Sequence, residues 1–303
     1  MTIIVAIVSE YEIVVASDSQ TTFGTSKRSD VDKISKVEFA DGAVALVAES
    51  GSAQLSGKAI ELLQRKAKGR KLDDYRLVAE LAEESLREVR NSQIQINVGC
   101  DFTGDKWERY FRDEYPVELL LAYYFEDKPY IFTVDLNTCT SNKTTLHYEA
   151  VGCGANLGGY LLGELSYQNM DPELATAIAV YVVESVKKHD AYCGGATKVA
   201  VVRRKPKTWA GFPSAAEVPL SKIYSRREVE KMVEIVSEMD KKTKKQRHTI
   251  IQKALTKENT RQMRGMLLTE ALSRYSNPRQ LRIDAARRRV RGSVIPPQNP
   301  ESK

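Results

Sequence analysis

The chain opens with Met1-Thr2-Ile3-Ile4-Val5-Ala6-Ile7-Val8, and after four polar residues it continues with Ile13-Val14-Val15-Ala16-Ser17-Asp18. Two β-branched runs joined by a short turn predict a β-hairpin. A hairpin of this length brings its two ends, Thr2 and Asp18, close together. Only Met1 and Thr2 precede the first predicted strand, and Thr2 is a small residue with a hydroxyl group.

Thr2 would carry two reactive groups if Met1 were removed. As the first residue it would hold a hydroxyl nucleophile and a free α-amine whose ordinary pKa, about 7.7–8.0, suits a general base near neutral pH. A threonine activated by its own amine is a recognised form of nucleophilic catalysis. A Met-Thr start is common, so it indicates a catalytic threonine only in combination with the residues around it.

Strands and helices alternate in groups along the next 200 residues. Polar residues 19–32 predict a loop or short ribbon, and Asp41-Gly42 is a hairpin-turn signal. Alternating or continuous apolar runs predict strands at residues 33–39, 43–48, 117–125, 130–134, 144–151 and 198–202. Amphipathic patterns predict helices at residues 53–68, 74–92, 156–167 and 171–188.

The grouping of these elements predicts the fold class. Strands are followed by a helix pair, more strands, a second helix pair and a closing strand, whereas parallel α/β sheets alternate strand and helix. Two antiparallel sheets packed face to face, with a helix pair on each outer face, satisfy this order. We therefore expect an α+β fold, a four-layer αββα sandwich.

The composition bears on the cellular compartment of the protein and on the metals or cofactors that it could bind. The 303 residues are 42% hydrophobic, contain no apolar run near twenty residues and show no signal-peptide pattern. No C-x-x-C pair occurs among the four cysteines, and the histidines at 147, 189 and 248 are scattered. The sequence thus favours a reducing, cytoplasmic setting and gives no indication of a zinc site, a disulfide framework, another metal or an organic cofactor.

Several short motifs, in their order, resemble a proteasome β-type subunit. They are the threonine before the first strand, Ala16-Ser17-Asp18, Asp32-Lys33-Ile34, Gly152-Cys153-Gly154 and Asp190-Ala191-Tyr192-Cys193-Gly194-Gly195. Residues 16–24 also resemble the bacterial HslV peptidase. The Met-Thr start and the long C-terminal extension are similar to the proteasome-related Anbu proteins. The resemblance runs from Thr2 to about Ile235, more loosely after residue 214.

The resemblance implies an N-terminal-nucleophile hydrolase, a threonine-type endopeptidase acting inside a self-compartmentalised homo-oligomeric ring or spiral. Its substrates would be peptides or unfolded proteins, with an ATPase unfoldase as a possible partner. Thr2 Oγ would be the nucleophile and its α-amine, through a water, the base. Lys33 would stabilise the alkoxide, Asp18 would orient Lys33, and Asp190 would support the surroundings of the nucleophile.

Two departures from the family pattern bear on activity. Cys153 and Cys193 stand where the family usually has serines, and a thiol is a weak hydrogen-bond donor. They are either small buried residues that pack well or thiols that make activity sensitive to oxidation. Glu49 stands where the family has a glycine whose N–H group serves as oxyanion donor. A carboxylate at this place adds negative charge near the developing oxyanion and so argues against strong peptidase activity. Alternatively, it indicates a preference for substrates with basic side chains.

The last part of the chain differs in charge from the rest. Residues 222–303 hold 21 Lys and Arg against 9 Asp and Glu, a net +12, while residues 1–221 carry −6. We therefore divide the chain into a proteasome-like domain at 1–221 and a basic helical extension at 222–303 with a disordered end. The extension is expected to assist assembly. Without interleaved aromatic residues it does not favour nucleic acid, and no membrane partner is expected.

A second function from another class fits the same sequence. The chain could be a catalytically silent proteasome-like scaffold, or a partner-binding subunit that uses its basic tail. Retention of Met1 on Thr2 would favour this alternative, because the hydroxyl would then lack its amine base.

Overall fold

The computed structural model describes residues 2–23, 26–95, 116–166, 168–204 and 221–240. Its contacts divide the chain into two compact units, Met1–Ser237 and Glu238–Lys303. The first unit contains all the strands of the described residues. Residues 241–303, which hold most of the predicted extension, lie outside the described part of the chain.

The N-terminal hairpin forms the centre of the first sheet. Strands β1 (Ile4–Val8) and β2 (Glu12–Ser17) pair antiparallel with Ile4 opposite Ser17, as predicted. The full order is β10-β1-β2-β11-β12, in which the added strands are β10 (Tyr148–Val151), β11 (Lys198–Arg203) and β12 (Ser221–Ile223). Every pairing is antiparallel.

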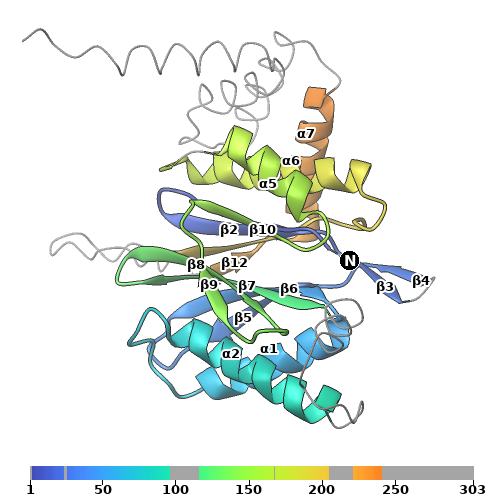
Figure 1. Cartoon of the computed structure of the whole chain (residues 1–303). Coiled ribbons are helices and arrows are strands. Elements are labelled where there is room, and N and C mark those ends of the chain that lie inside the picture. The colour runs from blue at the N-terminus through green and yellow to red at the C-terminus, as the bar shows by residue number, and fades with distance from the viewer. Residues whose placement is uncertain (1, 24–25, 96–115, 167, 205–220, 241–303) are drawn as a thin grey trace, which may run out of the picture. The chain divides into compact units, whose positions relative to one another are not determined.

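The second sheet has the order β5-β6-β7-β8-β9 and is also antiparallel throughout. Its strands are β5 (Ile34–Glu38), β6 (Val44–Gly51), β7 (Val117–Phe125), β8 (Lys128–Asp135) and β9 (Ser141–Lys143). A separate ribbon of β3 (Gln20–Phe23) and β4 (Ser26–Ser29) projects at the edge where the N-terminal end lies (Figure 1).

Helices cover the outer face of each sheet. Helices α1 (Ala53–Ala67) and α2 (Leu77–Val89), the latter followed by the π-helical turn η1 (Arg90–Gln95), pack on the second sheet. Helices α5 (Ala155–Leu165) and α6 (Pro172–His189) pack on the first. Figure 1 shows the resulting order of layers, helices, sheet, sheet, helices, which confirms the predicted α+β sandwich.

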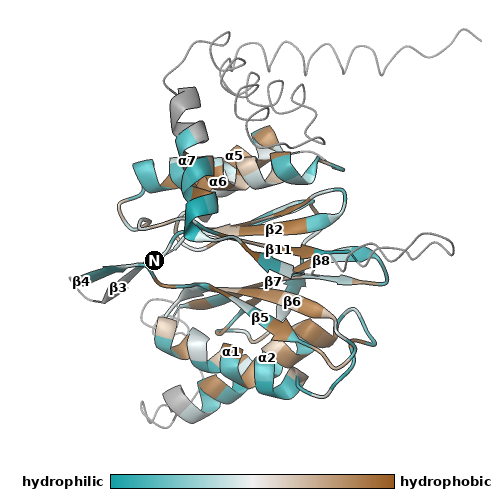
Figure 2. Ribbon diagram, turned by 180° about the vertical axis from the view of Figure 1, so that it is seen from behind, coloured by the Kyte–Doolittle hydropathy of each residue, from teal (hydrophilic) through white to brown (hydrophobic). Residues whose placement is uncertain are grey.

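Apolar side chains from both sheets fill the space between them. The alternation of side chains along a strand sends every second residue to this inner face. The inner cluster is Ile4, Ala6, Ile13, Val15, Ile34, Leu46, Ala48, Leu120, Ala122, Ile131, Val151, Ala200 and Val202. The intervening hairpin residues Ile3 and Val5 face α5, since a Cβ placed on Gly158 would lie 2.8 Å from Ile3 Cδ1 and 3.7 Å from Val5 Cγ1. Figure 2 shows hydrophobic colouring along the strands of both sheets and mixed colouring along the helices.

Helix α6 has a well-formed start. Pro172 occupies its first turn, where the missing N–H group costs nothing, and the Asp171 side chain accepts hydrogen bonds from the N–H groups of Glu173 and Leu174. The helix ends at His189, so Asp190 is the first residue beyond it. The loop that carries Asp190 and Cys193 therefore begins directly at the end of α6.

The structure differs from the predicted elements in three places. Strand β6 continues through Gly51 rather than ending at residue 48, because residues 49–51 pair with residues 117–119 of β7. Strand β9 was not predicted, and β10 covers only the last four of residues 144–151. Strand β12 and the buried Val229 of α7 (Arg226–Asp240) belong to the first compact unit, Met1–Ser237, and the division into domains at residue 221 stays a prediction.

Among the described residues, no helix combines the length and the apolar character needed to span a membrane.

Substitution of Leu120 tests the packing between the two sheets. It is fully buried in the inner cluster, so Leu120→Ala should lower the free energy of unfolding by about 2–5 kcal/mol. The control is Leu146→Ala, at a side chain 56% exposed, which should change stability by no more than about 0.5 kcal/mol. Equal effects of the two substitutions in urea titrations would contradict this assignment of the core.

Candidate active site

Thr2 lies two residues before the start of β1 and is almost fully buried, with 3% of its surface exposed. The hairpin register holds it in place, because the N–H group of Asp18 donates to the Ile3 carbonyl at 3.1 Å. In return, the Ile3 N–H group donates to Asp18 Oδ1 at 3.1 Å. The predicted closeness of the two hairpin ends is therefore present.

The Lys33 side chain reaches Thr2 from the residue just before β5. Its Nζ donates to Thr2 Oγ1 at 2.7 Å, to Asp18 Oδ1 at 2.8 Å and to the Gln20 carbonyl at 2.6 Å. An ammonium group has three N–H donors and no acceptor, so these contacts use all of them. The cation is thus fixed against the threonine hydroxyl.

Asp18 provides the counter-charge and joins two loops. Its carboxylate accepts from Lys33 and from the Ile3 N–H group on Oδ1, and from the Gly194 N–H group on Oδ2 at 2.9 Å. The side chains of Lys33 and Asp18 are 4% and 0% exposed. Burying two charges is costly unless further hydrogen bonds satisfy them, and here both groups have such bonds.

The turn at residues 152–154 packs against the backbone of Thr2. Gly152 has φ +94°, and a Cβ at this position would lie 2.3 Å from the Thr2 carbonyl oxygen and 3.0 Å from Ser50 Oγ. The Gly154 N–H group donates to the same Thr2 carbonyl at 3.3 Å. Only glycine at 152 allows this approach, which explains the first glycine of the Gly152-Cys153-Gly154 motif.

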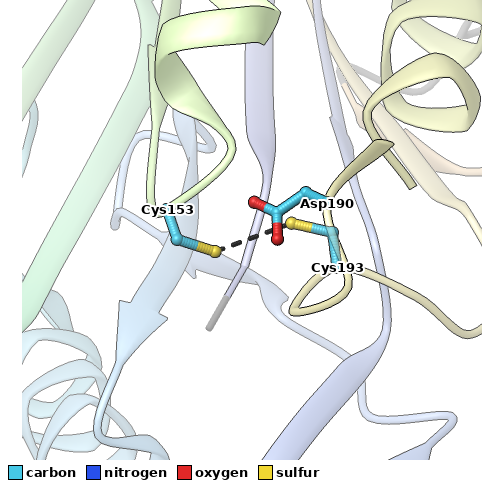
Figure 3. Close-up of side chains that lie close together, drawn as sticks. All are labelled: Cys153, Asp190 and Cys193. Carbon is cyan, nitrogen blue, oxygen red and sulfur yellow. Dashed lines mark hydrogen bonds between the residues drawn. The ribbon is translucent and has the colours of Figure 1, made fainter. Parts of the chain in front are cut away.

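Two cysteines stand beside the Thr2 nitrogen. The Thr2 N–H group donates to Cys153 Sγ at 3.2 Å, and Cys153 Sγ lies 3.6 Å from Cys193 Sγ (Figure 3). The hydrogen bond from the Cys193 thiol, together with the Thr2 backbone, lowers the pKa of Cys153 to about 7 despite partial burial. The same hydrogen bond and burial raise the pKa of Cys193.

Asp190 lies next to these sulfurs. A carboxylate oxygen of Asp190 is within 4.8 Å of both Sγ atoms, and Figure 3 shows its side chain between the two cysteines. Its Oδ1 accepts from the Tyr192 N–H group at 2.8 Å, and its carbonyl accepts from the Cys193 N–H group at 3.1 Å. Each of the other five predicted site residues thus contacts Thr2 or lies next to a residue of this group, with Asp190 beside the two cysteine sulfurs.

Glu49 occupies a different position from the one its place in the family pattern suggests. Its N–H group donates to the Lys33 carbonyl at 3.0 Å and so belongs to the β5–β6 ladder. This N–H group cannot also serve as an oxyanion donor. The side chain turns toward Ser56 of α1, and burial raises its pKa, an effect that Ser56 and Lys33 partly offset. Its Oε2 is buried without a hydrogen-bond partner among the described residues.

Sequence reasoning missed three contributors to the site. The Gln20 carbonyl holds Lys33, the Gly194 N–H group holds Asp18, and Ser50 lies near Thr2 and Gly152. Two of them act through backbone atoms and leave no side-chain signature. The Gly194-Gly195 pair was the one available signal, since a Cβ at Gly194 would lie 2.5 Å from Gln20 Oε1.

Comparison with known proteins supports the architecture. Residues 70–202 match the family model described as proteasome subunit, a range that lies after Thr2, Asp18 and Lys33. A search of the curated proteins found no match. Among solved structures, Anbu (ancestral beta-subunit) from Yersinia bercovieri is similar with a TM-score of 0.52 and 18% identity, covering 66% of this chain and 80% of that one.

Two further structures are similar over more of the chain. A mutant of Anbu from Hyphomicrobium sp. strain MC1 has a TM-score of 0.56 at 13% identity and covers 80% of this chain and 98% of that one. Anbu from the same strain has a TM-score of 0.55 at 14% identity, covering 80% and 97%. The expected resemblance to proteasome-related, Anbu-like proteins is therefore confirmed, and at these identities it concerns the fold.

The Lys33–Asp18 pair should contribute strongly to stability. Asp18→Ala leaves the buried ammonium without its counter-charge, so the free energy of unfolding should fall by about 3–5 kcal/mol. In a Lys33→Met background the same substitution should cost clearly less, which a double-mutant cycle measures. The matched control is Glu230→Gln at the exposed Arg226–Glu230 pair, which should cost less than about 1 kcal/mol. A cost for Asp18→Ala as small as that of the control would contradict the assignment.

Proposed function

We propose that the chain is a threonine-type peptidase that hydrolyses peptide bonds with Thr2 as its nucleophile after Met1 has been removed. The observation that carries this proposal is the 2.7 Å contact between Lys33 Nζ and Thr2 Oγ1 in a buried setting. A lysine used only for structure would not need a threonine hydroxyl as one of its three acceptors. A fixed cation at that oxygen is what a threonine alkoxide requires.

The reaction follows from this arrangement. The free α-amine of Thr2, acting through a water, takes the proton from Oγ1, while the Lys33 ammonium stabilises the charge that develops on the oxygen. Oγ1 attacks the carbonyl carbon of the substrate, and the leaving amine receives the proton. A water then hydrolyses the ester on Thr2 and restores the hydroxyl.

Removal of Met1 is essential to this mechanism. While Met1 is attached, the Thr2 nitrogen belongs to a peptide bond and has no basic lone pair. Its N–H group points to Cys153 Sγ at 3.2 Å, so the freed amine would lie at one side of the nucleophile with Lys33 at the other. The base and the cation would then act on the same hydroxyl.

Gly51 supports an oxyanion donor different from the one the family pattern suggests. N–H groups along a central antiparallel strand point alternately to its two neighbours. In β6 the Glu49 N–H group points to β5, where it donates to the Lys33 carbonyl. The Gly51 N–H group points to the same side, beyond the last β5–β6 pair, Ile34 opposite Ala48. We assign it as the donor for the developing oxyanion.

Assembly completes the proposal. Related folds lead us to expect a homo-oligomeric ring or spiral that encloses the site, with an ATPase unfoldase as a possible supplier of unfolded substrate. The basic extension, residues 222–303, would assist assembly against the acidic body of a neighbouring copy.

The second candidate function, a catalytically silent scaffold, is favoured by one observation. The expected oxyanion donor, the Glu49 N–H group, already donates to the Lys33 carbonyl, and the Thr2 nitrogen contacts the weakly donating thiol of Cys153, which in turn contacts Cys193. A scaffold would keep the sandwich and its assembly and would show no cleavage in any state.

Substitution of the nucleophile separates the two functions. Thr2→Ala should abolish cleavage of a fluorogenic peptide, and Lys33→Met should lower kcat by at least about 100-fold because the alkoxide loses its cation. The control is Lys128→Met, at an exposed lysine of β8, which should leave kcat unchanged. Circular dichroism checks that each variant is folded. Residual activity of Thr2→Ala equal to that of the unsubstituted chain would rule out the peptidase proposal.

The buried carboxylate of Glu49 indicates a preference for substrates with basic side chains. Its Oε2 is buried without a hydrogen-bond partner among the described residues, and Glu49 lies two residues before Gly51, the strand end that would receive a substrate, so a basic side chain there would gain a charged hydrogen bond. A peptide library should show cleavage after Lys or Arg, and Glu49→Gln should lower kcat/KM for those peptides by about 10- to 100-fold. Cleavage of uncharged peptides serves as the internal control. A library profile without preference for basic residues would refute this role.

A further inference from the structure

The peptidase mechanism leaves the cysteine pair without a role. Cys153 comes from the turn before α5, whereas Cys193 and Asp190 come from the loop after α6. One ligand atom from each lies within 4.8 Å of the others, and the two sulfurs are 3.6 Å apart (Figure 3). The Thr2 nitrogen is a fourth atom of the group, 3.2 Å from Cys153 Sγ. Two segments and Thr2 thus converge on one point.

The distances fit a tetrahedral metal centre better than a disulfide. Zinc–sulfur bonds of about 2.3 Å in tetrahedral geometry place two sulfurs about 3.8 Å apart. The observed 3.6 Å is close to this value. A disulfide requires the sulfurs at about 2.0 Å, so the observed separation is not that of a disulfide.

The chemistry of the ligand atoms selects the kind of ion. Thiolates prefer soft or borderline metals, and a set of two thiolates, one carboxylate and one nitrogen is typical of Zn²⁺ rather than of Mg²⁺ or Ca²⁺. We propose that Cys153, Cys193 and Asp190 bind one Zn²⁺ ion, with the freed α-amine of Thr2 as the fourth ligand. On binding, two thiols and the amine, if protonated, release their protons to solvent.

The surroundings meet the further requirements of a metal site. Two thiolates and a carboxylate this close together repel one another unless a cation is present, and the Lys33 ammonium already has three acceptors. The Tyr192 N–H group holds the Asp190 carboxylate at 2.8 Å, as outer-shell donors hold metal ligands. Cys153 is exposed and Cys193 is buried, so an ion can enter from the side of Cys153.

The consequence for activity rests on the proposed function. A Thr2 amine that donates its lone pair to Zn²⁺ cannot accept a proton from Oγ1. Zinc would therefore inhibit hydrolysis reversibly, and a chelator would restore it. The spacing of the cysteines along the chain gives no hint of such a site, because residues 153 and 193 meet only in the folded protein.

Metal binding can be tested without any measurement of activity. The full-length chain, reduced and freed of metal, is titrated with Co²⁺ as a spectroscopic substitute for Zn²⁺. We expect one Co²⁺ per chain with a sulfur-to-cobalt charge-transfer band, and displacement of Co²⁺ by one equivalent of Zn²⁺. Absence of the band would overturn the proposal, as would loss of two free thiols without metal uptake, which indicates a disulfide.

Variants locate the site. Cys153→Ser and Cys193→Ser should each weaken Zn²⁺ binding by more than the roughly 10- to 100-fold that loss of an outer-shell partner costs, and Asp190→Asn should weaken it as well. The control is Cys139→Ser, at a buried cysteine outside this group, which should bind metal unchanged. A band that survives Cys153→Ser and Cys193→Ser would place the metal elsewhere and overturn the proposal.

Thr2→Ala separates this inference from the proposed function, because it keeps the α-amine and removes the hydroxyl. This variant should bind Co²⁺ as the unsubstituted chain does but cleave no peptide. Metal binding by a chain that never cleaves peptides would contradict the peptidase proposal alone. Cleavage that is indifferent to Zn²⁺, in a chain without the band, would contradict the metal site alone.

Discussion

The buried ammonium group of Lys33 is the constraint on which the site depends. A cation with 3% of its residue exposed is stable only if each N–H donor has an acceptor, and the three acceptors come from different segments. The hairpin supplies Thr2 and Asp18, and the start of the β3 ribbon supplies the Gln20 carbonyl. The register of β1 against β2, the position of the loop after β2 and the packing of the two sheets must all be correct for one side chain to be satisfied. The stability of the site and the proposed function therefore depend on the same contacts.

The parts of the fold that were predictable are those with strong local signals. The side-chain sequence alone was enough to predict three features. These are the N-terminal hairpin with its β-branched runs, the helix start at Asp171-Pro172 and the grouping of strands and helices. The extension of β6 through Gly51 was not predictable, because Glu49-Ser50-Gly51 has turn-like composition and is held in the strand by pairing with β7. The short β9 is likewise determined by its neighbour β8.

The residues of the candidate site also divide into those that side-chain patterns predicted and those that they could not predict. The hairpin geometry indicated that Thr2 and Asp18 meet, and the family resemblance added Lys33, Asp190 and the two cysteines. Backbone contributions could not be foreseen, since the Gln20 carbonyl and the Glu49 N–H group look like those of any residue. The loss of Glu49 as a donor follows from its pairing with Lys33, and this shifts the expected oxyanion position along β6 to Gly51. The Thr2 nitrogen then has two possible tasks, as a base for Oγ1 or as a ligand beside Cys153, and it cannot perform both at once.

The central claim is that Thr2, freed of Met1, is a nucleophile held against the Lys33 ammonium. Mass spectrometry of the purified chain before and after treatment with a covalent threonine-directed inhibitor tests it most directly. The account predicts an untreated mass that lacks one methionine and a single inhibitor adduct that peptide mapping places on Thr2. An unmodified chain that retains Met1 would contradict it.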